Sequence, residues 1–309
     1  MAEQPDLTGD NGAVASDPSP VLSGLADLDP VPDIRLIAVD MDGTLLDAEG
    51  RIDPTLWPLL RELDRRGIAF CPASGRQYAN LAARFDGVGD DVVFIAENGA
   101  YVARGGREVS SDVLADDLVG RVVETVRALA ASGADVGVVV CGKRSAYVER
   151  HDTAFIAECD TYYALLERVD DLLLVRDDVL KIAVFDFGSA EVTTAPALEP
   201  FRATHQVVVS GAHWVDVMNA RTDKGAALRA VQAALGVTRA QTMAFGDYLN
   251  DLELLDAAEY SFAMADAHPT VVERARYLAP SNRANGVVRT IATVLAIPLA
   301  ELDAGARSD

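Results

Sequence analysis

The chain has 309 residues, half of them hydrophobic, which is enough to form roughly two domains with substantial cores. Its formal net charge of −21 argues against nucleic acid and anionic membrane surfaces as partners, because both repel an acidic protein. No run of about 18 consecutive apolar residues is present, so we expect no transmembrane helix.

The first 33 residues contain no lysine or arginine and carry proline, serine, glycine and aspartate between scattered apolar residues. A secretory signal needs a basic start followed by an apolar core, and neither is found here. We predict a disordered acidic tail for residues 1–33. The three cysteines are widely spaced and form no CxxC pair, so we expect free thiols in a reducing compartment and a cytoplasmic protein.

Five short apolar runs that stop abruptly at polar residues follow in chain order. Runs of this kind are typical of strands that are buried on both faces of a sheet. They occupy residues 34–42, 68–75, 92–99, 242–247 and 260–266, with helical patterns between them at 55–66, 77–85 and 224–235. The alternation predicts an α/β fold with a Rossmann-like, doubly wound parallel sheet as its core.

About 140 residues separate the third of these strands from the fourth, far more than one crossover between parallel strands requires. This segment contains helical patterns at 118–131 and 153–166 and strand-like runs at 136–140, 181–187 and 206–210. It therefore predicts an inserted α+β cap domain, placed to act as a lid over the ligand crevice. We predict a core of residues 34–112 and 212–300, a cap of residues 113–211 and a C-terminal tail of residues 301–309.

Carboxylates follow the first and the fourth predicted strands, at the sheet edge where parallel α/β sheets bind ligands. Asp40 and Asp42 are two residues apart and project to the same side of an extended chain. Such a pair suits a metal ion, or a nucleophile with a general acid/base, or simply an acidic capping loop. Asp247 is followed by Asn250 and Asp251 on the same side of a first helical turn. These oxygen donors suit Mg²⁺, although a helix-capping cluster would use the same residues.

Two further residues stand where a phosphate group could bind. Ser74 precedes a glycine and a helix start, which is typical of a helix N-cap and also of a phosphate cradle. Lys224 is one of only three lysines and opens a helix, although the helix dipole favours anions at that end. This placement suits a lysine that binds a phosphoryl group, and a solvated surface lysine is the alternative.

Four motifs occur in a fixed order: DMDGT at 40–44, ASGR at 73–76, DKG at 223–225 and GDYLND at 246–251. Together with the insertion, ENG at 97–99 and the SN and NGV segments within 281–288, they resemble the haloacid dehalogenase (HAD) superfamily, in its Cof-type subgroup with a type IIB cap. The resemblance covers nearly all of the chain outside its two tails. It implies a Mg²⁺-dependent phosphomonoester hydrolase that acts on a small-molecule phosphate ester, in particular a sugar phosphate, through an aspartyl phosphate.

The same resemblance implies a role for each matching residue. Asp40 is expected to be the nucleophile, and Asp42 the general acid and then the general base. Mg²⁺ is expected on the Asp40 carboxylate, the Asp42 backbone carbonyl and Asp247, with Asp251 supporting the metal waters from behind. The residues assigned to the phosphate are Thr44, which would also orient Asp42, Ser74, Lys224 and Asn250. The residues expected to face the substrate are Arg76, Glu97 and Asn98.

Two other functions remain open at this level. A phosphomutase of the same superfamily would return the phosphoryl group to a sugar hydroxyl. A non-catalytic sensor would bind a phosphometabolite without turning it over, but such a protein has no need of Asp42 and Lys224, so we favour an enzyme. One departure is the run Met-Ala-Asp-Ala at 264–267, where the family commonly has Met-Gly-Asn-Ala. The alanine predicts a turn that does not require positive φ.

Overall fold

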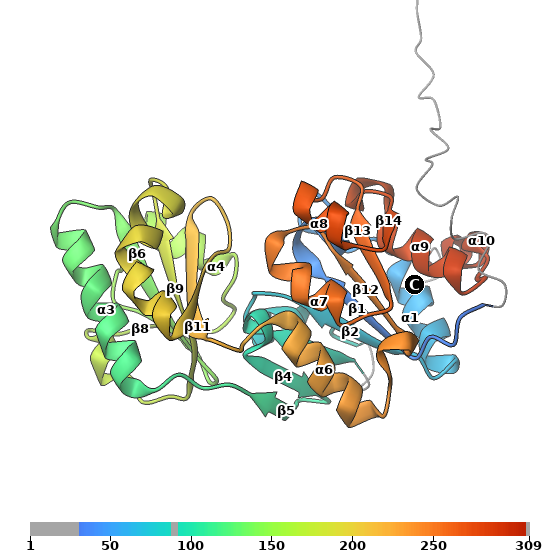
Figure 1. The fold of residues 1–309 in the computed structure, drawn as a ribbon, viewed down its shortest axis with the longest axis horizontal. Helices are drawn as coiled ribbons and strands as arrows, with labels where there is room; N and C mark the ends of the chain where they lie inside the picture. The colour runs from blue at the N-terminus through green and yellow to red at the C-terminus, as the bar shows by residue number, and fades with distance from the viewer. Residues whose placement is uncertain (1–30, 88–91, 307–309) are drawn as a thin grey trace, which may run out of the picture.

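The computed structural model describes residues 31–87 and 92–306, so the predicted N-terminal tail lies outside the described residues except for its last three positions. Two β-sheets, each with its own helices, lie side by side (Figure 1). The chain completes part of the larger sheet, forms the smaller sheet, and then returns to finish the larger one.

The larger sheet has eight strands in the order β14–β13–β12–β1–β2–β3–β4–β5. The strands from β14 to β3 in this order are parallel, and β4 and β5 are added antiparallel at one edge. All five predicted strands are present, so the expected α/β fold with a parallel sheet core is confirmed. The strands are β1 (Leu36–Asp40), β2 (Ala69–Ala73), β3 (Val93–Ala96), β4 (Tyr101–Arg104), β5 (Arg107–Ser111), β12 (Thr242–Gly246), β13 (Tyr260–Met264) and β14 (Tyr277–Ala279).

Helices cover both faces of this sheet, as the alternation of side chains along β1 shows. Ile37 and Val39 face one helical layer, whereas Leu36 and Ala38 face the other. The continuous apolar run of β1 therefore reflects burial from both sides. The first layer contains α1 (Leu56–Arg65), α2 (Tyr78–Arg84), α9 (Gly286–Val294) and α10 (Leu299–Ala306), and the second contains α6 (Lys224–Leu235), α7 (Leu252–Asp256) and α8 (Pro269–Arg274).

The smaller sheet has six strands in the order β10–β11–β9–β6–β7–β8, which are antiparallel except for the pair β7 and β8. Helices α3 (Asp116–Ala131) and α5 (Ala195–Leu198) pack on one face, and α4 (Thr153–Asp160) packs on the other. The strands are β6 (Val136–Gly142), β7 (Ala146–Val148), β8 (Leu166–Arg168), β9 (Val179–Asp186), β10 (His205–Val209) and β11 (Trp214–Asn219). We call this unit the cap.

One-turn segments connect these elements. They are η2 (Met41–Leu45), η3 (Glu97–Gly99), η4 (Leu172–Leu174), η5 (Ala190–Thr194), η6 (Glu199–Ala203), η7 (Arg239–Gln241), η8 (Leu249–Asp251) and η9 (Asn282–Ala284).

The cap sheet extends further along the chain than the sequence predicts. Strand β11 pairs with β9 and β10, so the predicted return to the core at residue 212 is too early. The sequence analysis predicts no strand here, because Asp216 interrupts the short apolar run of β11. The predicted limits at residues 33/34 and 112/113 remain predictions.

Two predicted ends also differ from the structure. The helix predicted for 153–166 ends at Asp160, because Tyr162 and Tyr163 turn to pack edge-on against Trp214. The predicted C-terminal tail is helical up to Ala306, since α10 buries Leu302 in the core that it shares with α1.

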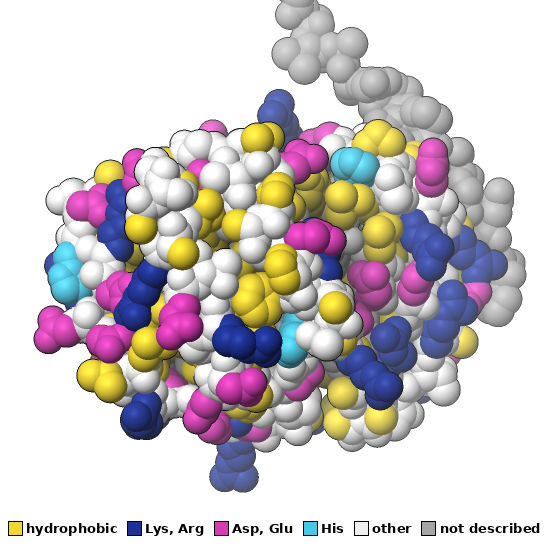
Figure 2. All heavy atoms as spheres, turned by 60° about the vertical axis from the view of Figure 1, so that its left-hand side comes forward, with side chains coloured by type: hydrophobic (Ala, Val, Ile, Leu, Met, Phe, Trp, Pro, Cys, Tyr) yellow, Lys and Arg dark blue, Asp and Glu magenta, His cyan; other side chains and the backbone are white. Residues whose placement is uncertain are grey.

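Other predictions concern the surface and the thiols. No helix in the described part of the chain is long and apolar enough to cross a membrane. On the face drawn in Figure 2, acidic, basic and apolar side chains are interspersed. Cys71, Cys141 and Cys159 are buried free thiols, as predicted.

Candidate active site

The central strands of the larger sheet bring two distant aspartates together. In β1 and β12, Ala38 pairs with Ala244 in parallel register, so the two strands end at the same edge of the sheet. Asp40 is the last residue of β1, and Asp247 directly follows β12. Gly43 lies in the turn after Asp40 with a φ of +82°, and a Cβ there would collide with the Asp247 carboxylate. A glycine is therefore required for this turn to lie against Asp247.

Lys224 begins α6 and is almost completely buried. Its Nζ donates to Asp40 Oδ1 at 2.5 Å and to Asp251 Oδ1 at 2.7 Å. Burial by itself lowers the pKa of Lys224, but the carboxylates of Asp251 and Asp40 outweigh it, and the pKa is raised above its usual value. Lys224 is thus a charged ammonium group beside Asp40, and the alternative of a solvated surface lysine is wrong.

Three carboxylates form the centre of the site: oxygens of Asp40, Asp247 and Asp251 lie within 4.8 Å of one another. Burial is the largest cause that raises the pKa of Asp40, and the charges of Asp251 and Asp247 add to it against the opposing effect of Lys224. Burial, followed by the charge of Asp251, also raises the pKa of Asp247 to about 6. Three carboxyl groups lie around the single ammonium of Lys224, so their full ionisation leaves an excess of negative charge, and a divalent cation with oxygen ligands fits this excess.

Asp251 supports its neighbours in the site through both of its carboxylate oxygens. Its Oδ1 accepts from Lys224, and its Oδ2 accepts from the backbone N–H groups of Asp247 and Tyr248 at 3.1 and 3.2 Å. It therefore belongs to the carboxylate group itself and also fixes the turn that carries Asp247. Thr44 was expected to orient Asp42, but its hydroxyl donates to Asp247 Oδ1 instead, at 2.9 Å.

Asp42 lies beside Arg76, on the side of the cavity that faces the cap. Arg76 donates from Nε to Asp42 Oδ2 at 2.8 Å and from Nη2 to Oδ1 at 2.6 Å. Its Nη1 donates to the Thr161 carbonyl of the cap at 2.6 Å, and its guanidinium lies 5.0 Å from the centre of the Tyr162 ring. Arg76, which was expected to face the substrate, therefore binds the predicted acid/base and the cap at the same time.

Ser74 and Asn98 lie at the base of the cavity. Ser74 is buried, and its Oγ accepts from the Arg76 N–H at 3.2 Å. Asn98 donates from Nδ2 to Asp216 Oδ2 at 2.9 Å, and its Oδ1 accepts from Asn250 at 3.3 Å. Asn98 therefore links the core to the cap. Its hydrogen bond with Asn250 also fixes the position of the Asn250 side chain.

Glu97 is buried among protein groups. Its Oε2 forms an ion pair with Nζ of Lys181, a cap residue of β9, at 3.0 Å. In the part of the chain that the structure describes, neither oxygen of the Glu97 carboxylate accepts a hydrogen bond. Burial raises the pKa of Glu97 against the opposing effect of Lys181. Glu97 thus pairs with the cap rather than standing ready for a ligand.

Sequence analysis missed the residues that the cap contributes. A cavity of about 490 Å³ joins Asp40, Asp42, Ser74 and Asp247 of the core to cap residues that include Glu158, Tyr162, Lys181, Trp214 and Asp216. The available signal was the charge of Lys181 and Asp216 inside otherwise apolar strands, since charged residues are rarely buried without a specific partner.

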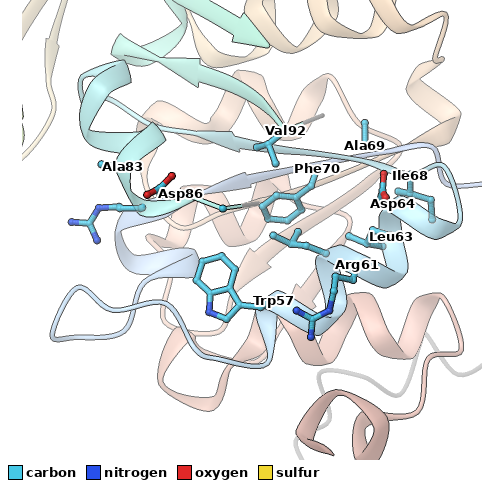
Figure 3. Close-up of a pocket in the computed structure, with 13 residues that line it drawn as sticks. Trp57, Arg61, Leu63, Asp64, Ile68, Ala69, Phe70, Ala83, Asp86 and Val92 are labelled. Carbon is cyan, nitrogen blue, oxygen red and sulfur yellow. The ribbon is translucent and has the colours of Figure 1, made fainter. Parts of the chain in front are cut away.

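A second cavity of about 500 Å³ lies elsewhere in the core, with a floor that includes Trp57, Leu63, Ile68 and Phe70 (Figure 3). Ala69 begins β2, so this cavity lies at the opposite strand ends from the carboxylate group. It lacks the arrangement of carboxylates and lysine described above, and we assign the chemistry to the cavity beneath the cap.

Comparison with known proteins shows the family of this chain. The model of the haloacid dehalogenase-like hydrolases matches residues 37–291. Over 270 residues the chain is 34% identical to the 5-amino-6-(5-phospho-D-ribitylamino)uracil phosphatase YbjI of Escherichia coli (strain K12), covering 85% of this chain and 96% of that protein.

Solved structures show the same arrangement of core and cap. The structure of SMU.1108c from Streptococcus mutans UA159 matches with a TM-score of 0.78 and 25% identity, covering 85% of this chain and 99% of that one. The subclass IIB sugar phosphatase BT4131 matches with a TM-score of 0.71 and 20% identity. The match covers 85% of this chain and 100% of that one.

Proposed function

This chain belongs to the haloacid dehalogenase-like hydrolase family, and we propose that it is a Mg²⁺-dependent phosphomonoester hydrolase that acts on a small phosphometabolite. In this proposal Asp40 is the nucleophile and Asp42 is the general acid and base. Relatives of this chain are named as phosphatases, and one of them is named for a phosphorylated ribitylaminouracil as its substrate.

One observation carries the proposal: a buried carboxylate, Asp40, lies in hydrogen-bond contact with a buried ammonium, Lys224, at the rim of a cavity that Asp42 also lines. A phosphate ester and a carboxylate repel each other, so a nucleophilic aspartate needs positive charge beside it. Lys224 supplies one such charge. Mg²⁺, held by Asp40, Asp247 and the backbone carbonyl of Asp42, would supply the rest by neutralising the phosphoryl oxygens.

The proposed reaction has two halves. The Asp40 carboxylate attacks phosphorus, the ester P–O bond breaks, and the leaving oxygen takes a proton from Asp42. A water molecule then gives a proton to Asp42 while its oxygen attacks the same phosphorus. The P–O bond to Asp40 breaks, which releases inorganic phosphate and restores the free carboxylate.

The cavity also bears on the substrate. Among the cap residues that line it, Glu158 and Ser210 offer polar groups that suit the hydroxyl groups of a sugar or sugar-alcohol phosphate. Its cap side carries Tyr162 and Trp214, which are partly exposed and suit a planar ring. We therefore propose a sugar-type phosphate as the substrate and, as a second candidate, a sugar-alcohol phosphate whose leaving group bears a heteroaromatic ring.

A phosphate-release screen tests the proposal. The panel contains hexose and pentose phosphates, flavin mononucleotide, pyridoxal phosphate and nucleotides, each with Mg²⁺ and with EDTA. We expect turnover that needs Mg²⁺ and is highest for one of the two substrate classes above. No Mg²⁺-dependent release from any ester would contradict the proposal, and an isomeric phosphate as the product would indicate a mutase.

A further inference from the structure

The three carbonyl groups of Ser74, Gly75 and Arg76 are all held in place, each by a different donor. The Ser74 carbonyl accepts from the Asn98 N–H at 2.9 Å, and the Arg76 carbonyl accepts from the Glu97 N–H at 3.1 Å. The middle carbonyl, that of Gly75, accepts from Lys181 Nζ at 2.7 Å. Two of the donors come from the core turn after β3, whereas Lys181 belongs to the cap.

The peptide that Lys181 holds is the one that contacts the Ser74 hydroxyl. The Gly75 carbonyl and the Arg76 N–H belong to the same planar peptide group, so fixing one fixes the other. That Arg76 N–H donates to Ser74 Oγ at 3.2 Å. The ammonium group of Lys181 in the cap and the hydroxyl group of Ser74 in the core are therefore connected through the planar Gly75–Arg76 peptide group.

Lys181 is held in this position by burial and by three oxygens. Its side chain is 4% exposed, its Nζ donates to the Gly75 carbonyl, and it forms ion pairs with the carboxylates of Glu97 at 3.0 Å and Asp216 at 3.6 Å. The Asp216 oxygen lies 3.6 Å away and also accepts from Asn98. The core turn that carries Glu97 and Asn98 has positive φ at both residues, a conformation that non-glycine residues adopt only when their surroundings hold them. The ion pair between Glu97 and Lys181 of the cap helps to keep the turn in this conformation.

We propose that Lys181 is a positioning residue that aligns the phosphate-binding loop, Ser74–Arg76, from the cap. Because its donor comes from β9, the loop has all three carbonyls fixed only when the cap lies against the core as it does here. The inference rests on the proposed function, in that Ser74 is taken to bind the phosphoryl group. Lys181 itself need not touch the substrate.

The test uses the full-length protein with Mg²⁺ and inorganic phosphate as the probe. Lys181→Met alone would leave Glu97 buried without a counter-charge, which is strongly destabilising. The double variant Lys181→Met with Glu97→Gln removes both charges and leaves Asp216 its bond from Asn98. Lys143→Met is the matched control, because Lys143 is also a cap lysine but forms its ion pairs with Glu108 and Asp178, away from the loop.

The readouts are the dissociation constant of inorganic phosphate by calorimetry, together with KM and kcat on a phosphate ester. We expect the double variant to weaken phosphate binding and to raise KM about tenfold or more, with a smaller change in kcat, since a charge-assisted hydrogen bond that orders the loop is lost. The Lys143→Met variant should match the wild type in all three values.

A folded double variant with wild-type phosphate affinity and KM would overturn the proposal, even if its melting temperature were lower, because a lysine that only fastens the cap would affect stability alone. Calorimetry also separates this inference from the proposed function. If the wild type turned over no ester, the proposed function would fail, while the phosphate affinities of the wild type and the double variant would still decide the role of Lys181.

Discussion

Arg76 binds both carboxylate oxygens of Asp42, at 2.8 and 2.6 Å, although the Arg76 side chain is buried and that of Asp42 is half exposed. The fixed fork of the guanidinium thus sets the direction of a side chain that is otherwise free to rotate into solvent. Since Arg76 is itself held by the Thr161 carbonyl and lies against Tyr162, the orientation of Asp42 depends on the cap.

Arg76→Lys should lower kcat by about ten- to a hundredfold, because a lysine cannot bind both oxygens of Asp42. The loss should be larger for an alkyl phosphate, whose leaving oxygen needs a proton, than for p-nitrophenyl phosphate, whose leaving group does not. Steady-state kinetics with both esters measure the difference. Arg84→Lys is the control, since Arg84 lies on the same side of the core but donates to the Gly50 carbonyl. An equal loss with both esters would argue against an effect through Asp42.

Asp40→Asn should abolish turnover by several powers of ten while the binding of inorganic phosphate is retained, because the amide is a poor nucleophile that keeps the shape of the side chain. Phosphate release and phosphate calorimetry measure the two effects. Asp47→Asn, at a partly exposed position in the following loop, serves as the control. Turnover near the wild-type level in Asp40→Asn would remove Asp40 from the role of nucleophile.

The free energy of unfolding of the metal-free protein should fall as the pH rises from about 4 to about 6. This fall is measured as the difference between the wild type and the Asp247→Asn variant, which lacks the titrating group. The folded-state pKa of Asp247 is about 6, above its ordinary value of 3.8, chiefly because of burial. Within this window the folded protein keeps a proton that the unfolded chain has lost, so raising the pH favours unfolding. Asp40 acts in the same direction, since its pKa is also raised.

Mg²⁺ should reverse this trend, because its carboxylate ligands must be ionised. Thermal unfolding with EDTA and with Mg²⁺ should show a metal-induced rise of several degrees at pH 7.5 and a smaller one at pH 5. The rise should vanish in Asp247→Asn. An equal rise at both pH values would count against a site built from these carboxylates.

Trp214→Phe should weaken the preference for ring-bearing substrates. Trp214 packs edge-on against Tyr162 at 5.6 Å and lines the cavity, so a smaller ring removes contact area for a planar leaving group. We expect kcat/KM to fall about three- to tenfold for flavin mononucleotide and little for ribose 5-phosphate. Trp57→Phe is the matched control, because Trp57 is the second tryptophan and lines the other cavity (Figure 3). Equal losses with both substrates would contradict this assignment.

The sequence predicts the core of the site well, and the reason is local. Asp40, Asp42, Ser74 and Asp247 each follow a strand whose apolar run is visible in the sequence, and parallel strands end at a common edge. The turn at Ala265 also behaves as predicted, since Ala265 is not among the residues with positive φ.

The remaining parts depend on how the cap lies against the core, which no local pattern encodes. Arg76 lines the cavity, as expected, but its bonds to Asp42 and the cap could not be predicted from the sequence. Glu97 was also expected to face the substrate, and its ion pair with Lys181 is equally distant in sequence. Likewise, Thr44 reaches Asp247 rather than Asp42 because the turn at Gly43 folds back onto β12. Contacts of this kind follow from tertiary packing and not from spacing.

The pairing of β1 with β12 also determines when this protein can become active during its synthesis. The nucleophile and the phosphate-binding loop leave the ribosome early, but β12 emerges only after the whole cap has been made. Until then β1 lacks its neighbour on one side, and the carboxylates of Asp247 and Asp251 are absent. A nascent chain that stops before Thr242 is therefore expected to be inactive and to expose an unpaired strand edge, which makes release from the ribosome a point at which aggregation competes with folding.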